Sequence, residues 1–429
     1  MLSSRIPVAE AKLKPGSKVA VSGYVHETRM MGKLAFILLR DWTGKVQVIA
    51  KKNDVGDDVF SKTNVNKEDV IFVEGTVSKN SIAPDGVEIV LSNISVLSKV
   101  ERKLPVDPTG VVPSEIDTRL NYRFIDLRSE GVSSIFRAKS VIVNAFRDFM
   151  LSNGFVEIHP TTLVGAATEG GADVFEVQYF ENKAFLAQSP QLYKQMAVVG
   201  GLEKVFMTMP VFRAEKHNTI YHLNEIVQMD CEMGFCDDKM AIKCLVDAFR
   251  HIIRKASEFG PAKSVNPGIQ EVKNVKEYTY TETIDLLNEN NVKIKWGEDF
   301  SKEHEKRIFE ILNEDAYVIS DFPTAIRAFY SMPKEDNPEI CKSFDLMYKG
   351  LEISSGAQRI HVPAMLEAQL KKRGLEPAAF EFYIDSFRYG APPHAGWSLG
   401  LERLTMKALN LPNIREAMLF PRDRTRISP

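Results

Sequence analysis

The chain has 429 residues, of which 44% are apolar and 26% charged, and its formal net charge is −2. This composition fits a folded protein of about two or three domains and excludes a disordered chain. Its four cysteines include no C-x-x-C pair, which argues against a disulfide framework or a zinc ribbon. We find neither an apolar run of about 18 residues nor an apolar signal-peptide core, so we expect a soluble, cytoplasmic protein.

The first hundred residues are predicted to form a small β-barrel. Alternating apolar residues separated by turn signals mark its strands, at 18–29, 33–50, 69–79 and 87–97. About five strands in some eighty residues are typical of an OB-fold, which binds single-stranded nucleic acid by aromatic stacking. Phe36 is a candidate stacking platform, although a core phenylalanine would give the same pattern. Residues 1–110 carry 16 Lys and Arg against 13 Asp and Glu. This small positive excess would favour binding of a polyanion, but chance variation in surface charge explains it equally well.

A second domain is predicted to follow a proline-rich connector. We place the barrel at 1–102, the connector at 103–131 and the second domain at 132–429. Helical periodicity begins at Ser133 and ends at Asn153-Gly154, and Pro160 assigns the next strand to an edge or an interface. Strands and helices then mix without regular βαβ spacing, which indicates an α+β fold with a largely antiparallel sheet.

The stretch FRAEKHNTIYHLNE, residues 212–225, places many charged residues next to the apolar run KVFMTMPV. It is consistent with a surface turn, a metal site or a phosphate clamp. A zinc site would use two histidines and two cysteines, His217, His222, Cys231 and Cys236. Their spacing matches no familiar zinc pattern, and the neighbouring Arg213 and Lys216 would repel a cation. Structural or phosphate-facing histidines are therefore favoured.

Common catalytic signatures do not explain the chain. It contains neither G-x-x-x-x-G-K-[ST] nor G-x-G-x-x-G, so any ATP must be held by a different clamp. GWSLG at 396–400 matches the nucleophile motif of esterases, with Ser398 as nucleophile. An α/β-hydrolase needs its histidine after the serine, whereas the last histidine here is His394.

Four further segments carry polar and charged residues of the same kind. They are TEGGA (168–172), QSPQLYKQ (188–195), GLEISSGAQRIH (350–361) and GWSLGLERL (396–404). Each could be an ordinary loop. Together with Pro160 after a long helix and FRAE…HLNE, they resemble the three signature motifs of class II aminoacyl-tRNA synthetases. QSPQLYKQ, FRAEKHNT, SGAQRIH, PPHAGW and FPRD are similar to aspartyl-tRNA synthetases of the archaeal and eukaryotic type, and the resemblance covers nearly the whole chain.

The resemblance implies ATP-dependent activation of L-aspartate, with Mg²⁺, and transfer to the 3′ end of tRNA(Asp). It implies catalytic roles for Arg213, Arg403 and Lys194, with Arg213 on the α-phosphate and Arg403 and His222 on the γ-phosphate. The implied ATP-binding residues are Arg213, Glu215, Tyr221, His222, Leu223, Glu352, Gly400 and Arg403. The implied Mg²⁺ ligands are Glu352 and Ser355. The implied aspartate-binding residues are Glu169, Gln191, Lys194, Arg213, Asp230, Ser355 and Arg359.

In the barrel the resemblance implies an anticodon site, formed by His26, Phe36, Gln47, Pro84 and Glu88. Family members restricted to tRNA(Asp) often carry Trp and Lys where this chain has His26 and Pro84, so we expect tRNA(Asn) to be accepted too. The resemblance also implies a homodimer. Two alternatives stay open, an asparaginyl-tRNA synthetase and a non-catalytic synthetase-like RNA-binding protein.

Overall fold

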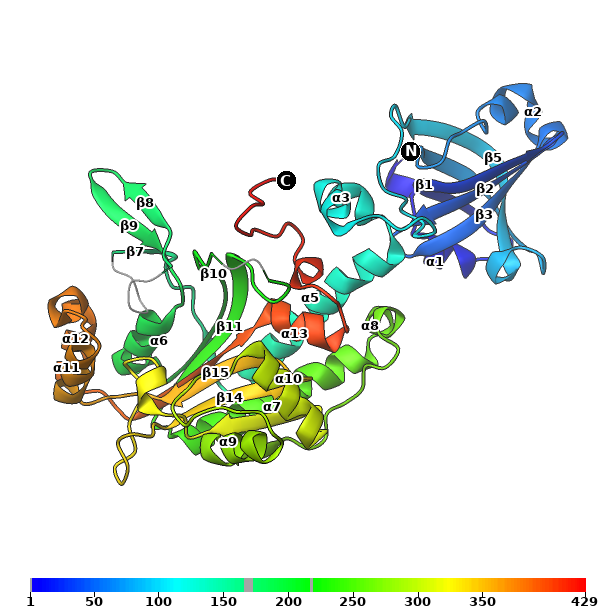
Figure 1. The fold of residues 1–429 in the computed structure, drawn as a ribbon. Helices are drawn as coiled ribbons and strands as arrows, with labels where there is room; N and C mark the ends of the chain where they lie inside the picture. Colours follow the sequence, from blue (N-terminus) through cyan, green and yellow to red (C-terminus); the bar gives the residue numbers. More distant parts are fainter. Residues whose placement is uncertain (1, 166–172, 217–218) are drawn as a thin grey trace. The chain divides into compact units, whose positions relative to one another are not determined.

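A computed structural model describes residues 2–165, 173–216 and 219–429. The chain divides into two compact units, one ending at Glu130 and one beginning at Gly131, each with its own hydrophobic core (Figure 1). The separate connector at 103–131 remains a prediction. Among the described residues, no helix combines the length and the apolar character needed to cross a membrane.

Five strands of the first unit close into a barrel in the order β1-β2-β3-β5-β4. Their bounds are β1 (Lys18–Met31), β2 (Leu34–Asp41), β3 (Gly44–Lys51), β4 (Val70–Lys79) and β5 (Val87–Ser98). Two helices accompany them, α1 (Val8–Lys12) and α2 (Lys52–Ser61). Along β2 the residues Ala35, Ile37 and Leu39 are buried in the barrel core, and because side chains alternate along a strand, Phe36 lies on the outer face. The OB-fold prediction is confirmed.

The second unit is built on an eight-stranded sheet in the order β12-β13-β14-β15-β16-β11-β10-β6. Only the β12–β13 and β10–β6 neighbours are parallel, which confirms the α+β prediction with a mainly antiparallel sheet. The strands are β6 (Val156–Glu157), β10 (Lys204–Phe212), β11 (Glu225–Gly234), β12 (Lys276–Thr279), β13 (Ala316–Ser320), β14 (Ser343–Tyr348), β15 (Glu352–Gln358) and β16 (His394–Gly400).

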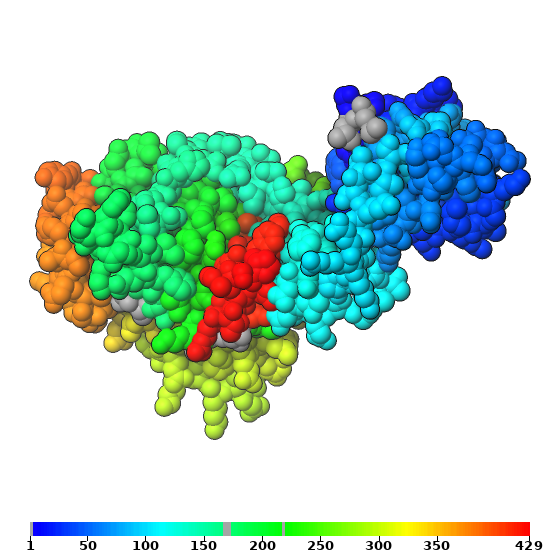
Figure 2. Space-filling view, turned by 90° about the horizontal axis from the view of Figure 1, so that it is seen from above, coloured from blue at the N-terminus to red at the C-terminus, as the bar shows by residue number. Residues whose placement is uncertain are grey.

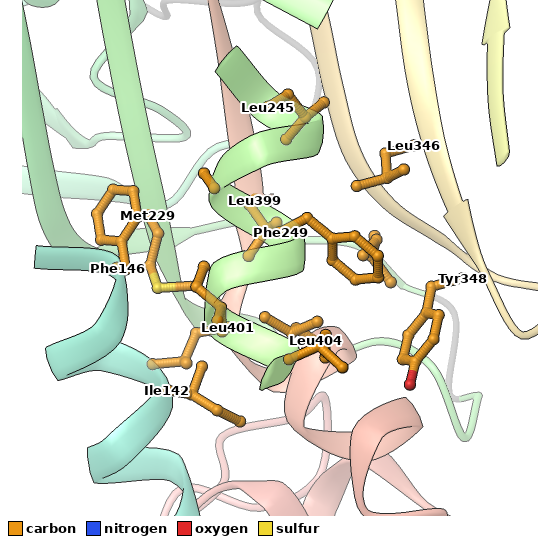
Figure 3. Packing of buried hydrophobic residues seen from close by; sticks show 14 of the residues in the cluster. Ile142, Phe146, Met229, Leu245, Phe249, Leu346, Tyr348, Leu399, Leu401 and Leu404 are labelled. Atoms are coloured by element: carbon orange, nitrogen blue, oxygen red, sulfur yellow. The ribbon is translucent and has the colours of Figure 1, made fainter. Parts of the chain in front are cut away.

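Three helices cover one face of this sheet. They are α5 (Glu130–Ser152), α7 (Asp238–Glu258) and α13 (Leu401–Ala408). Figure 3 shows Ile142 and Phe146 of α5 and Phe249 of α7 around the same apolar cluster as Met229 and Leu399 of the sheet. Burying so much apolar surface stabilises the sheet at about 25 cal/mol per Å² removed from water. The covered face is therefore a dry core, which leaves the other face of the central strands for polar residues.

Local signals set the ends of these helices. The Asp237 side chain accepts a hydrogen bond from Met240 N (2.8 Å) and so caps α7, while Gly154, with φ +79°, follows α5 as predicted. Pro160 comes after the short edge strand β6, in keeping with its predicted edge position.

The remaining elements are short strands and helices of the two units. A small sheet, in the order β7-β9-β8, contains β7 (Leu163–Val164), β8 (Glu176–Tyr179) and β9 (Asn182–Leu186). The other α-helices are α3 (Ile116–Asn121), α4 (Arg123–Asp126), α6 (Gln191–Ala197), α8 (Gly260–Val265), α9 (Tyr280–Glu289), α10 (Lys302–Leu312), α11 (Pro363–Lys372) and α12 (Glu381–Arg388).

Candidate active site

A cavity of about 470 Å³ opens on the sheet face opposite α5 and α7. The alternation along β11 creates it, because Gln228 and Asp230 line the cavity whereas Met229 and Cys231 belong to the apolar core. The walls come from β11, β15 and β16, the start of α13 and the segment that joins β10 to β11. We call that segment, residues 213–224, the clamp loop.

Hydrogen bonds join the two ends of the clamp loop. Arg213 N donates to Asn224 O (2.9 Å), and Asn224 Nδ2 donates to the carbonyl oxygens of Arg213 (2.7 Å) and Glu215 (3.0 Å). The Arg213 guanidinium lies 4.0 Å from the Glu215 carboxylate. The loop therefore presents a pre-positioned cation to the cavity, as a phosphate clamp requires.

A second cation, Arg403, enters the cavity from α13. Its Nη1 donates to Glu352 O (3.1 Å), and its Nη2 lies 3.2 Å from His222 Nε2. Burial, followed by the charge of Arg403, lowers the pKa of His222, so the imidazole is neutral at neutral pH. A neutral His222 that accepts from Arg403 at Nε2 carries its proton on Nδ1, where it can donate to Thr219 Oγ1 (2.6 Å). His222 thus orients Arg403.

A row of oxygen-bearing side chains crosses four strands of the sheet. The strand register pairs Asp345 with Ser355, Ser355 with Ser398, and Ser398 with Asp230. At one end, the Oδ1 atom of buried Asp345 has no hydrogen-bond partner among the described residues. Burial raises the pKa of Asp345 to about 7, although the nearby Arg327 opposes this shift.

This end of the row offers the oxygen donors that suit Mg²⁺. Glu352 and Ser355 line the cavity, and Asp345 pairs with Ser355 in the sheet. Burial would raise the pKa of Glu352, but Arg403, Lys302, Arg327 and Arg213 together lower it, so its carboxylate is ionised at neutral pH. No group of three or more His, Cys, Asp or Glu residues suited to a metal occurs in the described ranges. The donor set fits a Mg²⁺ ion that takes its other ligands from phosphate and water.

The other end of the cavity contains an interlocked set of four buried charges. Arg359 Nε and Nη2 donate to the two Glu232 oxygens (3.0 and 3.2 Å), and Lys194 Nζ lies 2.5 Å from Asp230 and 3.5 Å from Glu232. Although burial opposes the charged form, Arg359 and Lys194 lower the pKa of Glu232. Arg359 Nη1 has no protein partner in the described part of the chain, so it can still receive an anionic ligand.

Gly396 is needed for this arrangement. It pairs with Glu232 across β16 and β11, and a Cβ atom placed on it would lie 2.3 Å from Glu232 Oε2. A side chain at 396 would therefore displace the carboxylate that holds both cations.

The structure brings together nearly all residues predicted for ATP and aspartate. Those lining the cavity are Gln191, Arg213, Glu215, Tyr221, His222, Leu223, Asp230, Glu352, Ser355, Arg359, Gly400 and Arg403. Lys194 is fully buried behind Asp230 and does not line the cavity. Glu169 lies outside the described residues. Ile226 also lines the cavity.

Sequence reasoning missed several residues of this site. Gln228, Arg327 and Ser189 line the cavity, while Glu232 and Asp345 are buried next to it. The alternation in QMDCEM could have indicated that Gln228 and Glu232 share a face with Asp230. Nothing local indicated Asp345, because its position depends on pairing with β15.

The two other interpretations of the motifs are not supported by the geometry. Cys231 and Cys236 belong to the apolar cluster, whereas His222 lines the cavity and His217 lies outside the described residues. Ser398 donates a hydrogen bond to Asp230 (2.9 Å), so it has an acidic partner rather than the histidine of an esterase.

The outer face of the barrel carries three of the residues predicted for the anticodon. β2 pairs with β3 so that Leu38 faces Gln47, and Gln47 faces Glu88 of β5; Gln47 Nε2 donates to Glu88 (2.8 Å). Phe36, two residues from Leu38, is half-buried on the same face. His26 lies 3.0 Å from Arg40, and Pro84 is exposed in the turn before β5.

Comparison with known proteins identifies the family. Residues 115–424 match the family model described as "tRNA synthetases class II (D, K and N)", and residues 19–97 match the "OB-fold nucleic acid binding domain". The chain belongs to the class II aminoacyl-tRNA synthetases.

Two curated relatives of this synthetase are named "Aspartate--tRNA(Asp/Asn) ligase". The one from Methanocaldococcus jannaschii is 47% identical, with 98% of this chain and 97% of the relative covered. The one from Archaeoglobus fulgidus is 45% identical, with 98% and 100% covered. Among solved structures, the asparaginyl-tRNA synthetase of Pyrococcus horikoshii with asparaginyl-adenylate has a TM-score of 0.94 at 31% identity, with 99% of each chain covered. An aspartyl-tRNA synthetase from Entamoeba histolytica has a TM-score of 0.89 at 32% identity, with 99% of this chain and 93% of that chain covered.

Proposed function

We propose that this synthetase activates L-aspartate with ATP and transfers it to the 3′-terminal adenosine of tRNA(Asp) and tRNA(Asn). The proposal depends mainly on one observation. The same cavity has Arg213 and Arg403, which suit phosphates, at one end and the Arg359–Glu232 pair at the other. Curated relatives at 43–47% identity that are named for both tRNAs support the dual specificity.

In the first step an α-carboxylate oxygen of aspartate bonds to the α-phosphorus of ATP, and the bond to pyrophosphate breaks. The carboxylate is ionised at neutral pH, so no general base is needed. The barrier lies in bringing two anions together and in the charge that develops on the leaving pyrophosphate. Arg213 neutralises the α-phosphate, and Arg403, oriented by His222, binds the γ-phosphate. Removing one such donor typically costs about 3–4 kcal/mol of transition-state stabilisation.

Glu352 and Ser355 would hold Mg²⁺, and we add Asp345 as a third oxygen donor. A bound Mg²⁺ ion supplies positive charge that offsets the charge of the phosphates. The protein residues set its place, because the β14–β15 pairing fixes Asp345 beside Ser355, and Arg403 binds the backbone of Glu352.

Aspartate is recognised at the Arg359 end of the cavity. Glu232 fixes the guanidinium by two hydrogen bonds and leaves Nη1 for the substrate side-chain carboxylate. The side-chain amide of asparagine would either place its N–H group against the Arg359 N–H donor or lose one hydrogen bond. Either outcome would weaken binding by about 1–3 kcal/mol. Gln191 and Gln228 each have a buried side-chain atom without a partner among the described residues, which suits a polar ligand.

In the second step a hydroxyl oxygen of the terminal adenosine bonds to the aspartyl carbonyl carbon, the bond from that carbon to the AMP phosphate oxygen breaks, and AMP and the hydroxyl proton are released. The outer barrel face would bind the anticodon, with a base stacked on Phe36 and an edge read by Gln47. We propose that neither His26 nor Pro84 rejects the third anticodon base of tRNA(Asn).

A homodimer would form at the β6 edge of the sheet. β6 has a neighbour on one side only, and three apolar side chains in this region are exposed, Leu151 (56%), Val156 (45%) and Leu163 (42%). A second copy related by a two-fold axis would cover them. Light scattering of the purified chain tests this, and a monomer at micromolar concentration would contradict it.

Pyrophosphate–ATP exchange and aminoacylation test the whole proposal. Exchange should depend on aspartate and Mg²⁺, and labelled aspartate should be attached to transcripts of both tRNAs. Exchange with asparagine only would identify the asparaginyl alternative, which the structural similarity to the Pyrococcus enzyme favours. RNA binding without exchange would indicate a non-catalytic protein. Charging of tRNA(Asp) alone would remove the dual specificity and leave the reaction intact.

A further inference from the structure

The strand β15 contains a bulge at the phosphate end of the cavity. Its pairing with β14 passes from Ser354 directly to Glu352, so the register skips Ile353. Side chains alternate along a regular strand, and residues three positions apart, such as Glu352 and Ser355, would then lie on opposite faces. The extra residue changes this, because Ile353 belongs to the apolar core while Glu352 and Ser355 both line the cavity. The bulge therefore brings the two oxygen donors for Mg²⁺ to one face.

The helix α10 lies on the same face of the sheet as the cavity. Its buried Ile308 belongs to a cluster with Met347 of β14, whereas Leu346 and Tyr348 belong to the core on the opposite face. The yellow-green residues around α9 and α10 project at the lower edge of Figure 2. Glu305, one turn before Ile308, is only 3% exposed. A carboxylate buried to this degree needs partners for its charge.

Both carboxylate oxygens of Glu305 have partners, and one partner is the backbone of Glu352. Glu352 N donates to Glu305 Oε2 (3.1 Å), and Lys302 Nζ donates to Glu305 Oε1 (2.5 Å). Arg403 Nη1 donates to the carbonyl oxygen of the same Glu352 (3.1 Å). Side chains of α10 and α13 thus hold the N–H and the C=O group of Glu352, next to the bulge. Glu305 itself does not line the cavity, so it acts on the ion site through Glu352.

We propose that Glu305 is a positioning residue for the Mg²⁺ ion that binds with ATP, because it fixes the backbone from which the Glu352 carboxylate reaches the ion. This inference rests on the proposed function, in which Glu352 and Ser355 hold Mg²⁺ beside the phosphates. A bulge disrupts the regular hydrogen-bond ladder, so an acceptor from outside the sheet helps to keep Glu352 in one position. A charged acceptor suits this task, since it forms a stronger hydrogen bond than a neutral one.

Two reciprocal variants separate position from charge. Glu305→Asp keeps the charge but withdraws the acceptor from Glu352 N by one CH₂ group, whereas Glu305→Gln keeps an oxygen in place and removes the charge. Mn²⁺ serves as the probe, because it takes the same oxygen ligands as Mg²⁺. Water-proton relaxation then measures the affinity of the protein for the Mn²⁺–ATP complex, without aspartate, so that no adenylate forms.

The aspartate variant should lose more metal affinity than the glutamine variant. Glu305→Asp should weaken binding of the Mn²⁺–ATP complex about tenfold, as is usual when the partner behind a metal ligand is lost. Glu305→Gln should stay within about threefold of wild type, because a neutral acceptor remains. Affinity for ATP in EDTA, measured by calorimetry, should change less than about twofold in both variants, since Arg213 and Arg403 are still present.

Pyrophosphate–ATP exchange gives a second measurement. In Glu305→Asp the KM for Mg²⁺–ATP should rise about tenfold, whereas the KM for aspartate should stay within about twofold of wild type, because Arg359 lies at the other end of the cavity. The matched control is Glu310→Asp on the same helix. Glu310 is exposed and forms a surface ion pair with Arg307 (2.9 Å), so this change should alter neither KM nor the affinity for Mn²⁺–ATP.

Three results would overturn the inference. Wild-type affinity for Mn²⁺–ATP in Glu305→Asp would show that Glu305 only anchors α10 to the sheet. A larger loss in Glu305→Gln than in Glu305→Asp would show that its charge matters and its position does not. Equal losses of ATP affinity with and without the metal would indicate a general loosening of the cavity. Absence of exchange in wild type would instead reject the proposed function, so the two failures are distinguishable.

Discussion

The cavity and the outer barrel face hold their polar groups in different ways. In the cavity, Glu232 is fully buried and shared between Arg359 and Lys194, so each charge depends on the others. On the barrel face, Phe36 and Gln47 are partly exposed and Gln47 is held by a single hydrogen bond to Glu88. Substitutions in the cavity should therefore disturb stability and chemistry together, whereas those on the barrel face should change RNA binding alone.

The largest expected effect is that of Glu232→Gln on stability. It leaves Lys194 and Arg359 buried with one carboxylate fewer, which should cost about 3–5 kcal/mol of unfolding free energy. Urea unfolding of the second unit, followed by tryptophan fluorescence, measures this loss of unfolding free energy. Glu215→Gln, a partly exposed carboxylate of the same cavity, is the control and should cost under about 1 kcal/mol. Equal losses of unfolding free energy in the two variants would show that the buried charges contribute no more to stability than a partly exposed one.

Arg213→Ala should slow adenylate formation strongly while the fold persists. Loss of the α-phosphate cation should slow pyrophosphate–ATP exchange by about 10²- to 10³-fold. Its side chain is 35% exposed, so the melting temperature should change little. Affinity for tRNA should stay within a few-fold of wild type. Exchange at the wild-type rate would reject the clamp assignment.

Phe36→Ala should weaken tRNA binding by about 1–3 kcal/mol, the usual range for loss of one stacked base. Exchange without tRNA should be unchanged, in contrast to Arg213→Ala. Phe36→Tyr keeps the aromatic face and should bind like wild type. If Phe36→Ala instead lowers barrel stability without affecting RNA, the residue is a core phenylalanine.

The smallest expected effect is a pH dependence in the barrel. Burial, followed by the charges of Lys45, Arg40 and Lys67, lowers the pKa of His26 from 6.5 to about 4, and Asp107 opposes this shift. Between these values the unfolded chain binds more protons than the folded barrel. The contribution of His26 to the free energy of unfolding is therefore complete above pH 6.5 and is lost as the pH drops towards 4. After solvent screening this loss is about 1 kcal/mol. The urea midpoints measured at pH 7 and pH 5 should differ less in His26→Gln than in the wild type.

The sequence allowed the barrel strands and α5 to be predicted, because their signals are local. Alternating apolar residues mark β1 to β5, and Gly154 follows α5 directly. The motif residues of the cavity were accessible only through the family resemblance. Asp345 and the Glu232–Gly396 contact were missed, because they depend on which residues face each other across strands far apart in the chain. Side-chain periodicity does not encode that register.

The polar row from Asp230 to Asp345 makes the enzyme intolerant of changes in strand length. A single-residue insertion or deletion within β11, β15 or β16 would turn every following side chain to the other face, carrying Asp230 or Ser398 into the apolar core and an apolar neighbour into the cavity. Lengthening a surface connection such as the one between α9 and α10 leaves that alternation untouched. Length variation among natural homologues should therefore gather in the connections and spare these three strands.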